Sequence, residues 1–136
     1  MIMGKNEPEI NGVWPDLEGK CLQEMFAQEC WFQKDLEEEA NVVLIKVEGT
    51  WHHLYFDTAV IFWRISTDEP HEVKPPDRAE VSYHLRDLGA ELDLSGRIIK
   101  SCTARVIPEG SEVELGLEGG KKITFKNIDN LTSYEK

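Results

Sequence analysis

The segment DLEGKCL at residues 16–22 returns as DLSGRII at residues 93–99, and this repetition decides the fold that the sequence predicts. A second match follows in the same order, because VEGTWHHLYFD at residues 47–57 aligns without a gap with LEGGKKITFKN at residues 117–127. Self-similarity of this kind indicates a duplicated supersecondary unit. We therefore expect an internal repeat that covers residues 16–57 and 93–127.

Each copy predicts a three-stranded antiparallel meander. In the second copy, Val113, Leu115, Ile123 and Phe125 alternate with glutamate or lysine on either side of a glycine turn, which is typical of a half-buried hairpin. Residues 20–28 of the first copy also carry apolar side chains at helical spacing, so a helix is the alternative there. The matching segment of the second copy is rich in β-branched residues, and we therefore expect a strand.

The segment between the copies, residues 58–92, predicts a further strand and one short helix. The strand is TAVIFWRI at residues 58–65, which is apolar on both faces. Asp77 is a suitable helix N-cap, with Glu80 three residues later, and Gly89 is a suitable stop. The apolar residues between them recur at helical spacing and predict about three turns of amphipathic helix: Val81, Leu85 and Leu88.

These elements predict a mainly β protein, with an α+β arrangement as the second choice. The two meanders, the joining strand and the helix are expected to form one domain over residues 1–136, as a curved sheet or a barrel-like structure. Residues 1–12 and 129–136 are expected to be loose ends.

The charge of the chain restricts its partners. It carries 26 acidic and 15 basic residues, for a formal net charge of −11. This charge repels phosphate backbones and anionic lipid headgroups, so nucleic acid and membrane surfaces are not expected partners. Acidity of this size serves solubility, and it also suits a basic protein partner.

Cys21, Cys30 and Cys102 form no C-x-x-C pair, so we expect neither a disulfide framework nor a zinc site. The repeat aligns each cysteine with an apolar residue, which indicates small hydrophobic side chains. No stretch approaches about 18 uninterrupted apolar residues, and the first residues do not resemble a signal peptide. The expected location is a reducing cytoplasm.

GTWHHLYFD at residues 49–57 has the residue types of a metal or acid–base site. The ungapped repeat aligns His53 with Ile123, which predicts that His53 packs in the core and that His52 points to the opposite face. Neighbouring strand residues cannot chelate one metal together. We therefore predict no metal, no cofactor and no catalytic residue.

The same alignment predicts an apolar outer face on the first copy, where the second copy carries charged residues. Its members are Val42, Leu44, His52, Leu54 and Phe56. Such a patch is not left open to water, so something is expected to cover it. The predicted helix is the simplest cover, and a ligand, a second subunit or another protein is the alternative.

Three hypotheses for function follow. The first is a non-enzymatic interaction protein that binds a basic partner through carboxylates around an aromatic anchor, Trp51 or Trp63; immunity proteins that neutralise toxic nucleases are one instance. The second is a ligand-binding protein or modest enzyme that uses His53, Tyr55 and Asp57 in a pocket of the curved sheet. The third is a structural subunit that forms a homodimer through its apolar face.

Overall fold

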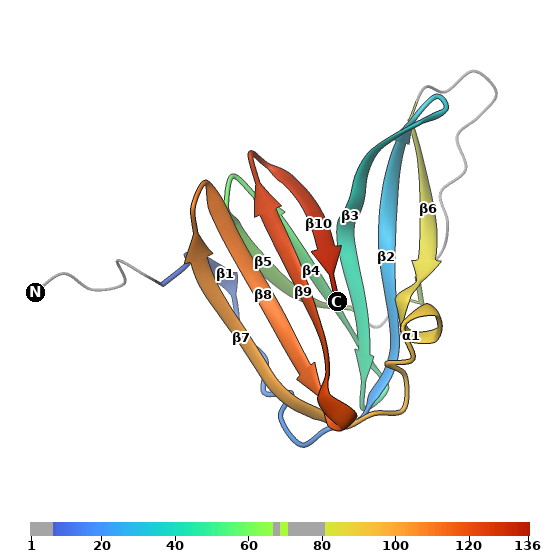
Figure 1. The fold of residues 1–136 in the computed structure, drawn as a ribbon, viewed down its shortest axis with the longest axis vertical. Coiled ribbons are helices and arrows are strands. Elements are labelled where there is room, and N and C mark those ends of the chain that lie inside the picture. The colour runs from blue at the N-terminus through green and yellow to red at the C-terminus, as the bar shows by residue number, and fades with distance from the viewer. Residues whose placement is uncertain (1–6, 67–68, 71–80) are drawn as a thin grey trace, which may run out of the picture.

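The computed structural model describes residues 7–66, 69–70 and 81–136, and in it the chain forms two packed β-sheets (Figure 1). The first sheet has six strands in the order β1-β5-β4-β3-β2-β6. All neighbours are antiparallel except β1 and β5, which are parallel. The strands are β1 (Ile10–Gly12), β2 (Leu22–Phe32), β3 (Asp35–Val47), β4 (Thr50–Asp57), β5 (Val60–Ser66) and β6 (Val81–Asp87).

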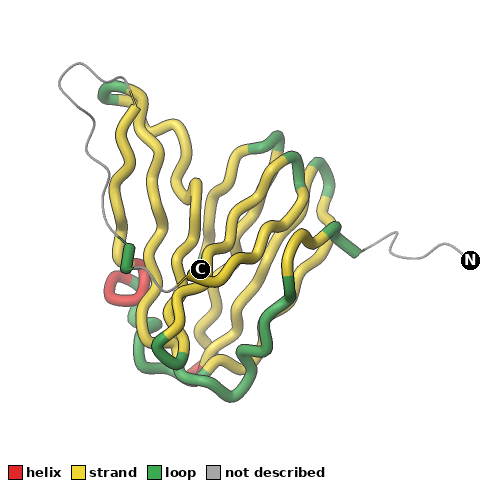
Figure 2. Tube along the Cα trace, turned by 180° about the vertical axis from the view of Figure 1, so that it is seen from behind, coloured by secondary structure: helices red, strands yellow, loops and turns green. Residues whose placement is uncertain are grey.

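The second sheet is an antiparallel meander of four strands in the order β10-β9-β8-β7. Its members are β7 (Ile99–Ile107), β8 (Gly110–Leu117), β9 (Lys121–Ile128) and β10 (Leu131–Glu135). Two short helical turns, α1 (Leu88–Glu91) and the 3-10 turn η1 (Glu118–Gly120), complete the described elements. The prediction of a mainly β protein is confirmed, whereas the barrel-like alternative is wrong, because the two sheets do not close on each other (Figure 2).

The core lies between the two sheets and is built from one side chain in two along each strand. This is the alternation expected of a sheet that buries one face. The first sheet contributes, among others, Met25, Val43, Ile45, Leu54 and Ile61. The second contributes Ile99, Val113, Leu115, Ile123 and Phe125, so the alternation predicted for β8 and β9 is confirmed.

Backbone hydrogen bonds between the two D-L-x-G segments join the sheets at one end. Gly19 N donates to Ile99 O at 2.8 Å, and Gly96 N donates to Leu22 O at 2.7 Å. Ile99 N donates to Lys20 O at 2.8 Å, and Leu22 N donates to Arg97 O at 2.9 Å. Cys21 and Ile98 form an isolated antiparallel bridge at the centre of this set. The bonds are therefore reciprocal between the two segments.

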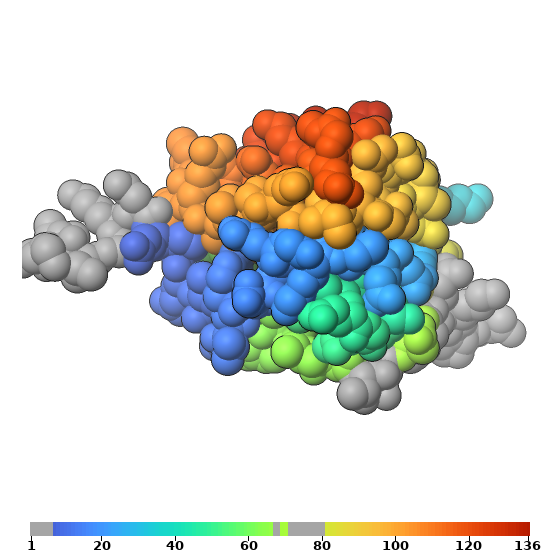
Figure 3. Space-filling view, turned by 90° about the horizontal axis from the view of Figure 1, so that it is seen from below, coloured from blue at the N-terminus to red at the C-terminus, as the bar shows by residue number. Residues whose placement is uncertain are grey.

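Both D-L-x-G segments turn in the same way. Lys20 N donates to Leu17 O, and Arg97 N donates to Leu94 O. Both leucine side chains are buried in the core. The view onto this end shows residues near 20, in blue, lying directly against the second half of the chain, in orange (Figure 3).

The two central hairpins differ by one residue, which breaks the ungapped alignment of the copies. Val47 pairs with Thr50 across a two-residue turn, whereas Leu117 pairs with Lys121 across a three-residue turn. Glu48 and Gly49 both have positive φ, as a tight two-residue hairpin turn requires. The internal repeat is accordingly not confirmed as it was aligned.

A shift of one residue moves every side chain of a strand to the other face. The prediction that His53 lies in the core and His52 outside is therefore wrong: His52 pairs with Ile45 on the inner face, and His53 pairs with Leu44 on the outer face. The predicted apolar face is split in the same way. His52, Leu54 and Phe56 are buried between the sheets, while Val42 and Leu44 lie on the outer face.

The predicted amphipathic helix is wrong for the residues that the structure describes. Asp77 and Glu80 lie outside those residues, but Val81–Asp87 forms strand β6, which pairs with β2 from Phe32 to Phe26. Helical structure begins only at Leu88, where the Asp87 carboxylate accepts a hydrogen bond from Ala90 N at 3.0 Å. This helix of four residues, Leu88–Glu91, does not cover the outer face.

Neither predicted loose end is loose throughout. Ile10–Gly12 pairs with Ile61–Trp63 as strand β1. Leu131–Glu135 pairs with the end of β9 as strand β10, so each meander has four strands rather than three. Strand prediction over residues 20–28 is confirmed from Leu22 onward, and the helical alternative there is wrong.

Two glycines of β8 give a matched test of the packing between β8 and β9. A Cβ at Gly110 would meet the backbone oxygen of Asn127 at 1.6 Å, which strand pairing cannot accommodate without a backbone shift. A Cβ at Gly116 would meet only the Ser101 hydroxyl, at 2.6 Å, at the end of a rotatable side chain. We expect Gly110→Ala to lower the free energy of unfolding by about 1–3 kcal/mol, as overpacking does, and Gly116→Ala to lower it less.

Urea unfolding followed by circular dichroism measures both variants. Equal stability of the two alanine variants would contradict the close approach of β8 and β9 at Gly110.

Candidate functional site

The structure separates the five residues that the sequence proposed for binding. Trp51, His53, Tyr55 and Asp57 share the outer face of β4, as their pairing with β5 shows. Trp63 lies on the inner face of β5, opposite Leu54. Four of the five residues are therefore on one face, but Trp63 belongs to the core, and the role of all five in binding stays a prediction.

The outer face around Trp51 is packed by its own neighbours. Phe26 lies 6.0 Å from the Trp51 ring, and the Lys46 ammonium lies 5.6 Å above it. Lys46 also forms an ion pair with Glu69 at 3.7 Å. Tyr55 stacks on Phe62 with ring centroids 4.9 Å apart. Trp51 is fully buried among these neighbours.

Trp63 and His52 form a buried hydrogen bond that fixes the state of the histidine. Trp63 Nε1 donates to His52 Nδ1 at 2.9 Å. Because an indole N–H only donates, Nδ1 must accept, and the neutral imidazole therefore carries its proton on Nε2. Burial lowers the pKa of His52, and the nearby charges of Lys20 and His53 lower it further. His52 is thus held neutral in one tautomer.

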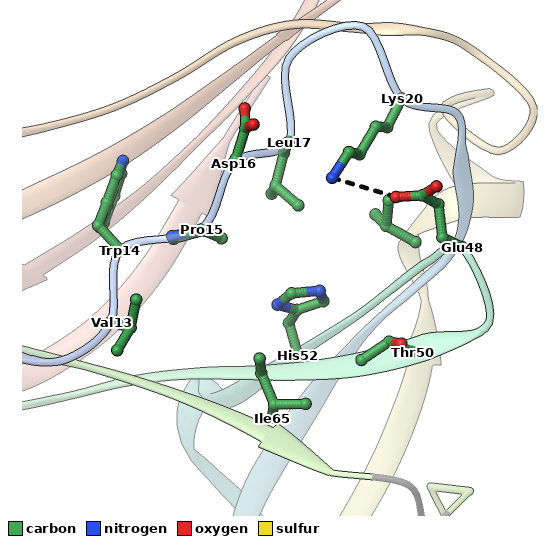
Figure 4. Close-up of a pocket in the computed structure, with 11 residues that line it drawn as sticks. Val13, Trp14, Pro15, Asp16, Leu17, Lys20, Glu48, Thr50, His52 and Ile65 are labelled. Carbon is green, nitrogen blue, oxygen red and sulfur yellow. Dashed lines mark ion pairs between the residues drawn. The ribbon is translucent and has the colours of Figure 1, made fainter.

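An open pocket of about 410 Å³ lies beside His52, between the β3–β4 turn and the segment that connects β1 to β2 (Figure 4). We call it the His52 pocket. Its apolar wall is formed by Val13, Trp14, Pro15, Leu17, Val47 and Ile65. Its polar residues are Asp16, Lys20, Glu48, Thr50 and His52.

Gly12 directs the chain into this wall. Its φ is 115°, and a Cβ would lie 2.2 Å from the backbone oxygen of Trp63, so only glycine passes so close to β5. Beyond it, the Trp14 ring packs on Trp63 with centroids 5.2 Å apart. The residues from Val13 onward then cross the end of the sandwich to the D-L-E-G turn.

A second candidate surface lies at the far end of the first sheet, where the β2–β3 hairpin and β6 extend past the second sheet (Figure 1). Three large apolar side chains are exposed there: Phe32 by 37%, Leu36 by 41% and Val81 by 42%. Phe32 pairs with Val81 on one side and Asp35 on the other, and Trp31 pairs with Leu36. We call these five residues, together with Glu37, the tip surface.

Carboxylates surround the apolar side chains of the tip surface. Asp35 and Glu37 are exposed, and Glu38 and Glu39 follow them on β3. Their field is felt nearby, because the pKa of the Cys30 thiol is raised first by burial and then by Glu38 and Glu37. The Trp31 indole donates to Glu29 at 3.1 Å and borders a hollow of about 640 Å³ that Glu29, Gln33, Lys34, His84 and Leu85 also line.

Sequence reasoning missed His52, Trp14 and the tip surface. The turn dipeptide Glu48-Gly49 carried the signal for His52, because a two-residue turn fixes which residues of β4 face inward. No local signal marked the tip surface, since exposure of Phe32 and Leu36 depends on where the second sheet ends.

The described residues show two further properties relevant to function. They contain no group of three or more His, Cys, Asp or Glu side chains that could hold a metal ion. Within the same residues, no helix has the length and apolar character needed to cross a membrane.

His52 predicts a pH dependence of stability. Its pKa is lower in the folded protein than the ordinary histidine value of about 6.5, so below that pH the unfolded chain binds more protons than the folded one. The stabilisation is complete above about pH 6.5 and declines as the pH falls toward the folded-state pKa. We expect the urea midpoint to fall between about pH 7.5 and 5.5, and to fall less in His52→Gln, whose amide oxygen accepts from Trp63 without titrating.

The comparison is the difference between the two midpoints of each protein, because other groups titrate in both. The same decline in wild type and His52→Gln would contradict a neutral, buried His52.

The cysteines predict an order of thiol reactivity. Burial, with a smaller contribution from Glu18, raises the pKa of Cys102 to about 12. Cys21 is exposed, and Cys30 is half-buried with a raised pKa. Because the thiolate is the reactive form, we expect iodoacetamide at about pH 8 to label Cys21 first, then Cys30, and Cys102 only after unfolding. Peptide mass spectrometry measures the order; early labelling of Cys102 would contradict it.

Comparisons with known proteins add nothing to this geometry. No protein-family model matches the chain, and no curated protein or solved structure matches it significantly. Arguments about function therefore start from the tip surface and the His52 pocket, and no family supplies a role for their residues.

Proposed function

We propose that the protein is a non-enzymatic binding protein whose tip surface docks onto a basic protein partner. The observation that carries the proposal is the exposure of Phe32, Leu36 and Val81 beside the carboxylates of Asp35 and Glu37. Phe32 and Val81 lie on one face of the tip, and Leu36 lies on the other, because Phe32 pairs with Val81 while its neighbour Trp31 pairs with Leu36. Exposed large apolar side chains gathered at one projecting tip commonly mark a surface for another macromolecule.

The chemistry of the tip surface suits a partner with positive charge. The chain has a formal net charge of −11, and the carboxylates of β3 concentrate part of that charge beside the apolar side chains. Complementary charge accelerates association, and apolar contacts that exclude water then supply affinity. The hollow beside Trp31 and Glu29 has the residue types that receive a lysine or arginine side chain.

The tip surface is also ordered before binding. Strand β2 pairs with β3 up to the Phe32–Asp35 pair and with β6 up to the Phe32–Val81 pair, so the backbone of the surface is held by two ladders of hydrogen bonds. A preordered surface loses less conformational entropy when a partner binds. An immunity protein that occupies the basic substrate cleft of a toxic nuclease would work in this way.

The test compares the tip surface with a matched surface elsewhere. The tip variant is Phe32→Ser with Leu36→Ser, and the control is Val106→Ser with Leu131→Ser, whose side chains are 44% and 57% exposed on the second sheet. Each tagged protein is incubated at low and moderate salt with lysate from its own source cells, and retained proteins are quantified by mass spectrometry. Light scattering at two concentrations checks each variant for self-association.

We expect wild type and control to retain the same basic protein, and the tip variant to lose it. With the purified partner, the tip variant should have a dissociation constant at least about tenfold higher than wild type, which corresponds to a loss of about 1.4 kcal/mol of binding free energy. Higher salt should lower the association rate constant more than it changes the dissociation rate constant. Equal retention by the tip variant, or no basic protein on any column, would overturn the proposal. A concentration-dependent dimer that the tip variant abolishes would assign the surface to a second copy instead.

A further inference from the structure

The His52 pocket is separate from the tip surface. Asp35, in the tip surface, is the first residue of β3, and Glu48, in the His52 pocket, follows its last residue. Because β3 has 13 residues, about 40 Å separates the two sites at roughly 3.3 Å per residue. The pocket therefore raises a question that the proposed function does not answer. Its apolar wall includes Val13 and Ile65, which are 80% and 65% exposed at the rim.

Two hydrogen-bond donors face the pocket from different elements. His52, on β4, is 8% exposed and presents Nε2–H, since Nδ1 accepts from Trp63. Within the part of the chain that the structure describes, Nε2 makes no hydrogen bond. Nε2 is not sealed from solvent, since the buried side-chain atoms without a partner in the described residues are Trp51 Nε1 and Glu112 Oε2. A ligand that enters the pocket can therefore accept a hydrogen bond from Nε2–H. The His52 ring rises from β4 into the pocket (Figure 4).

Lys20 supplies the second donor and a positive charge. Its ammonium extends toward the His52 ring and lies 3.1 Å from Glu48 Oε1 (Figure 4). An ammonium has three donors, so others remain for a ligand. Lys20 and His52 both line the pocket and face each other across it (Figure 4). The Asp16 carboxylate, in contrast, points away from the His52 ring (Figure 4).

We propose that the His52 pocket binds a small organic acid with an apolar body. The carboxylate of the ligand lies between Lys20 and His52, accepting hydrogen bonds from Nζ and from Nε2–H. Its hydrocarbon part lies against Trp14, Leu17 and Ile65.

The pocket residues favour this class over others. A phosphate monoester carries up to two negative charges, while the pocket offers one ammonium that already pairs with Glu48 and a neutral imidazole. An amine would face two donors and no inward-pointing carboxylate that lacks an ion pair. A volume of about 410 Å³ and a mostly apolar wall are typical of sites for small ligands with few polar groups.

The experiment titrates the full chain with phenylacetate and hexanoate, followed by heteronuclear NMR of the Trp63 indole N–H and the methyl groups of Val13 and Ile65. 2-Phenylethylamine and 2-phenylethanol are probes of similar size without a carboxylate. We expect at least one of the two acids to shift the pocket signals saturably below about 10 mM, a range accessible to small weak ligands, and the amine and the alcohol to shift them at least about tenfold more weakly.

Two variants test the assigned contacts without altering the core. Lys20→Met keeps the apolar stem and removes the charge, and Ile65→Glu places a negative charge at an exposed rim position. Each should raise the dissociation constant of the bound acid at least about tenfold. Lys100→Met, at an exposed lysine of β7, should leave that dissociation constant unchanged.

The proposal is overturned if neither acid shifts the pocket signals by about 10 mM, if the amine binds as well as the acid, or if Lys20→Met binds as wild type does. Signals of the tip surface serve as the internal reference, because they should not move on acid binding. Loss of partner capture by the tip variant has no bearing on these titrations, so the two proposals can fail separately.

Discussion

The reciprocal backbone hydrogen bonds between residues 19–22 and 96–99 are the constraint on which the sandwich depends. They join the start of β2 to the start of β7, and each strand begins one of the two meanders. With the strand starts fixed together and Leu17 and Leu94 buried beside them, the inner faces of both meanders meet at one level. The His52 pocket lies at this joined end, and the tip surface lies where the sheets have parted (Figure 1).

The sequence was sufficient for the fold class and for the positions of β2 to β5 and β7 to β9, but not for β1, β6 and β10 or for the facing of β4. Alternation is a property of neighbouring residues, so the pattern in β8 and β9 could be interpreted directly. The facing of β4 was instead inferred from its alignment with β9, and the extra residue in the Leu117–Lys121 turn made that inference wrong. His52 and His53 therefore exchanged places, and the pocket histidine was assigned to the outer face.

The error in the predicted helix has a different cause, which is competition between local and tertiary preferences. Val81, Leu85 and Leu88 have helical spacing, yet β6 completes the edge of β2 with a ladder of hydrogen bonds that a helix there would forfeit. Tertiary packing also decides which tryptophans are buried: Trp51 packs against Phe26 and Trp63 against Trp14, and the role of both in binding stays a prediction. Trp31 and Phe32 extend past the second sheet and have fewer such neighbours.

The reciprocal bonds also have a consequence for the order of folding. Each meander is built from hairpins with short turns, whose closure is fast, whereas the bonds between residues 19–22 and 96–99 close a loop of most of the chain. The hairpins can therefore form early, but the two sheets are held together only after that long loop closes. Until then, the inner faces of both meanders are exposed to water and to other chains. A nascent chain cannot cover the inner face of its first meander until β7 to β10, which begin at Ile99, have also been synthesised.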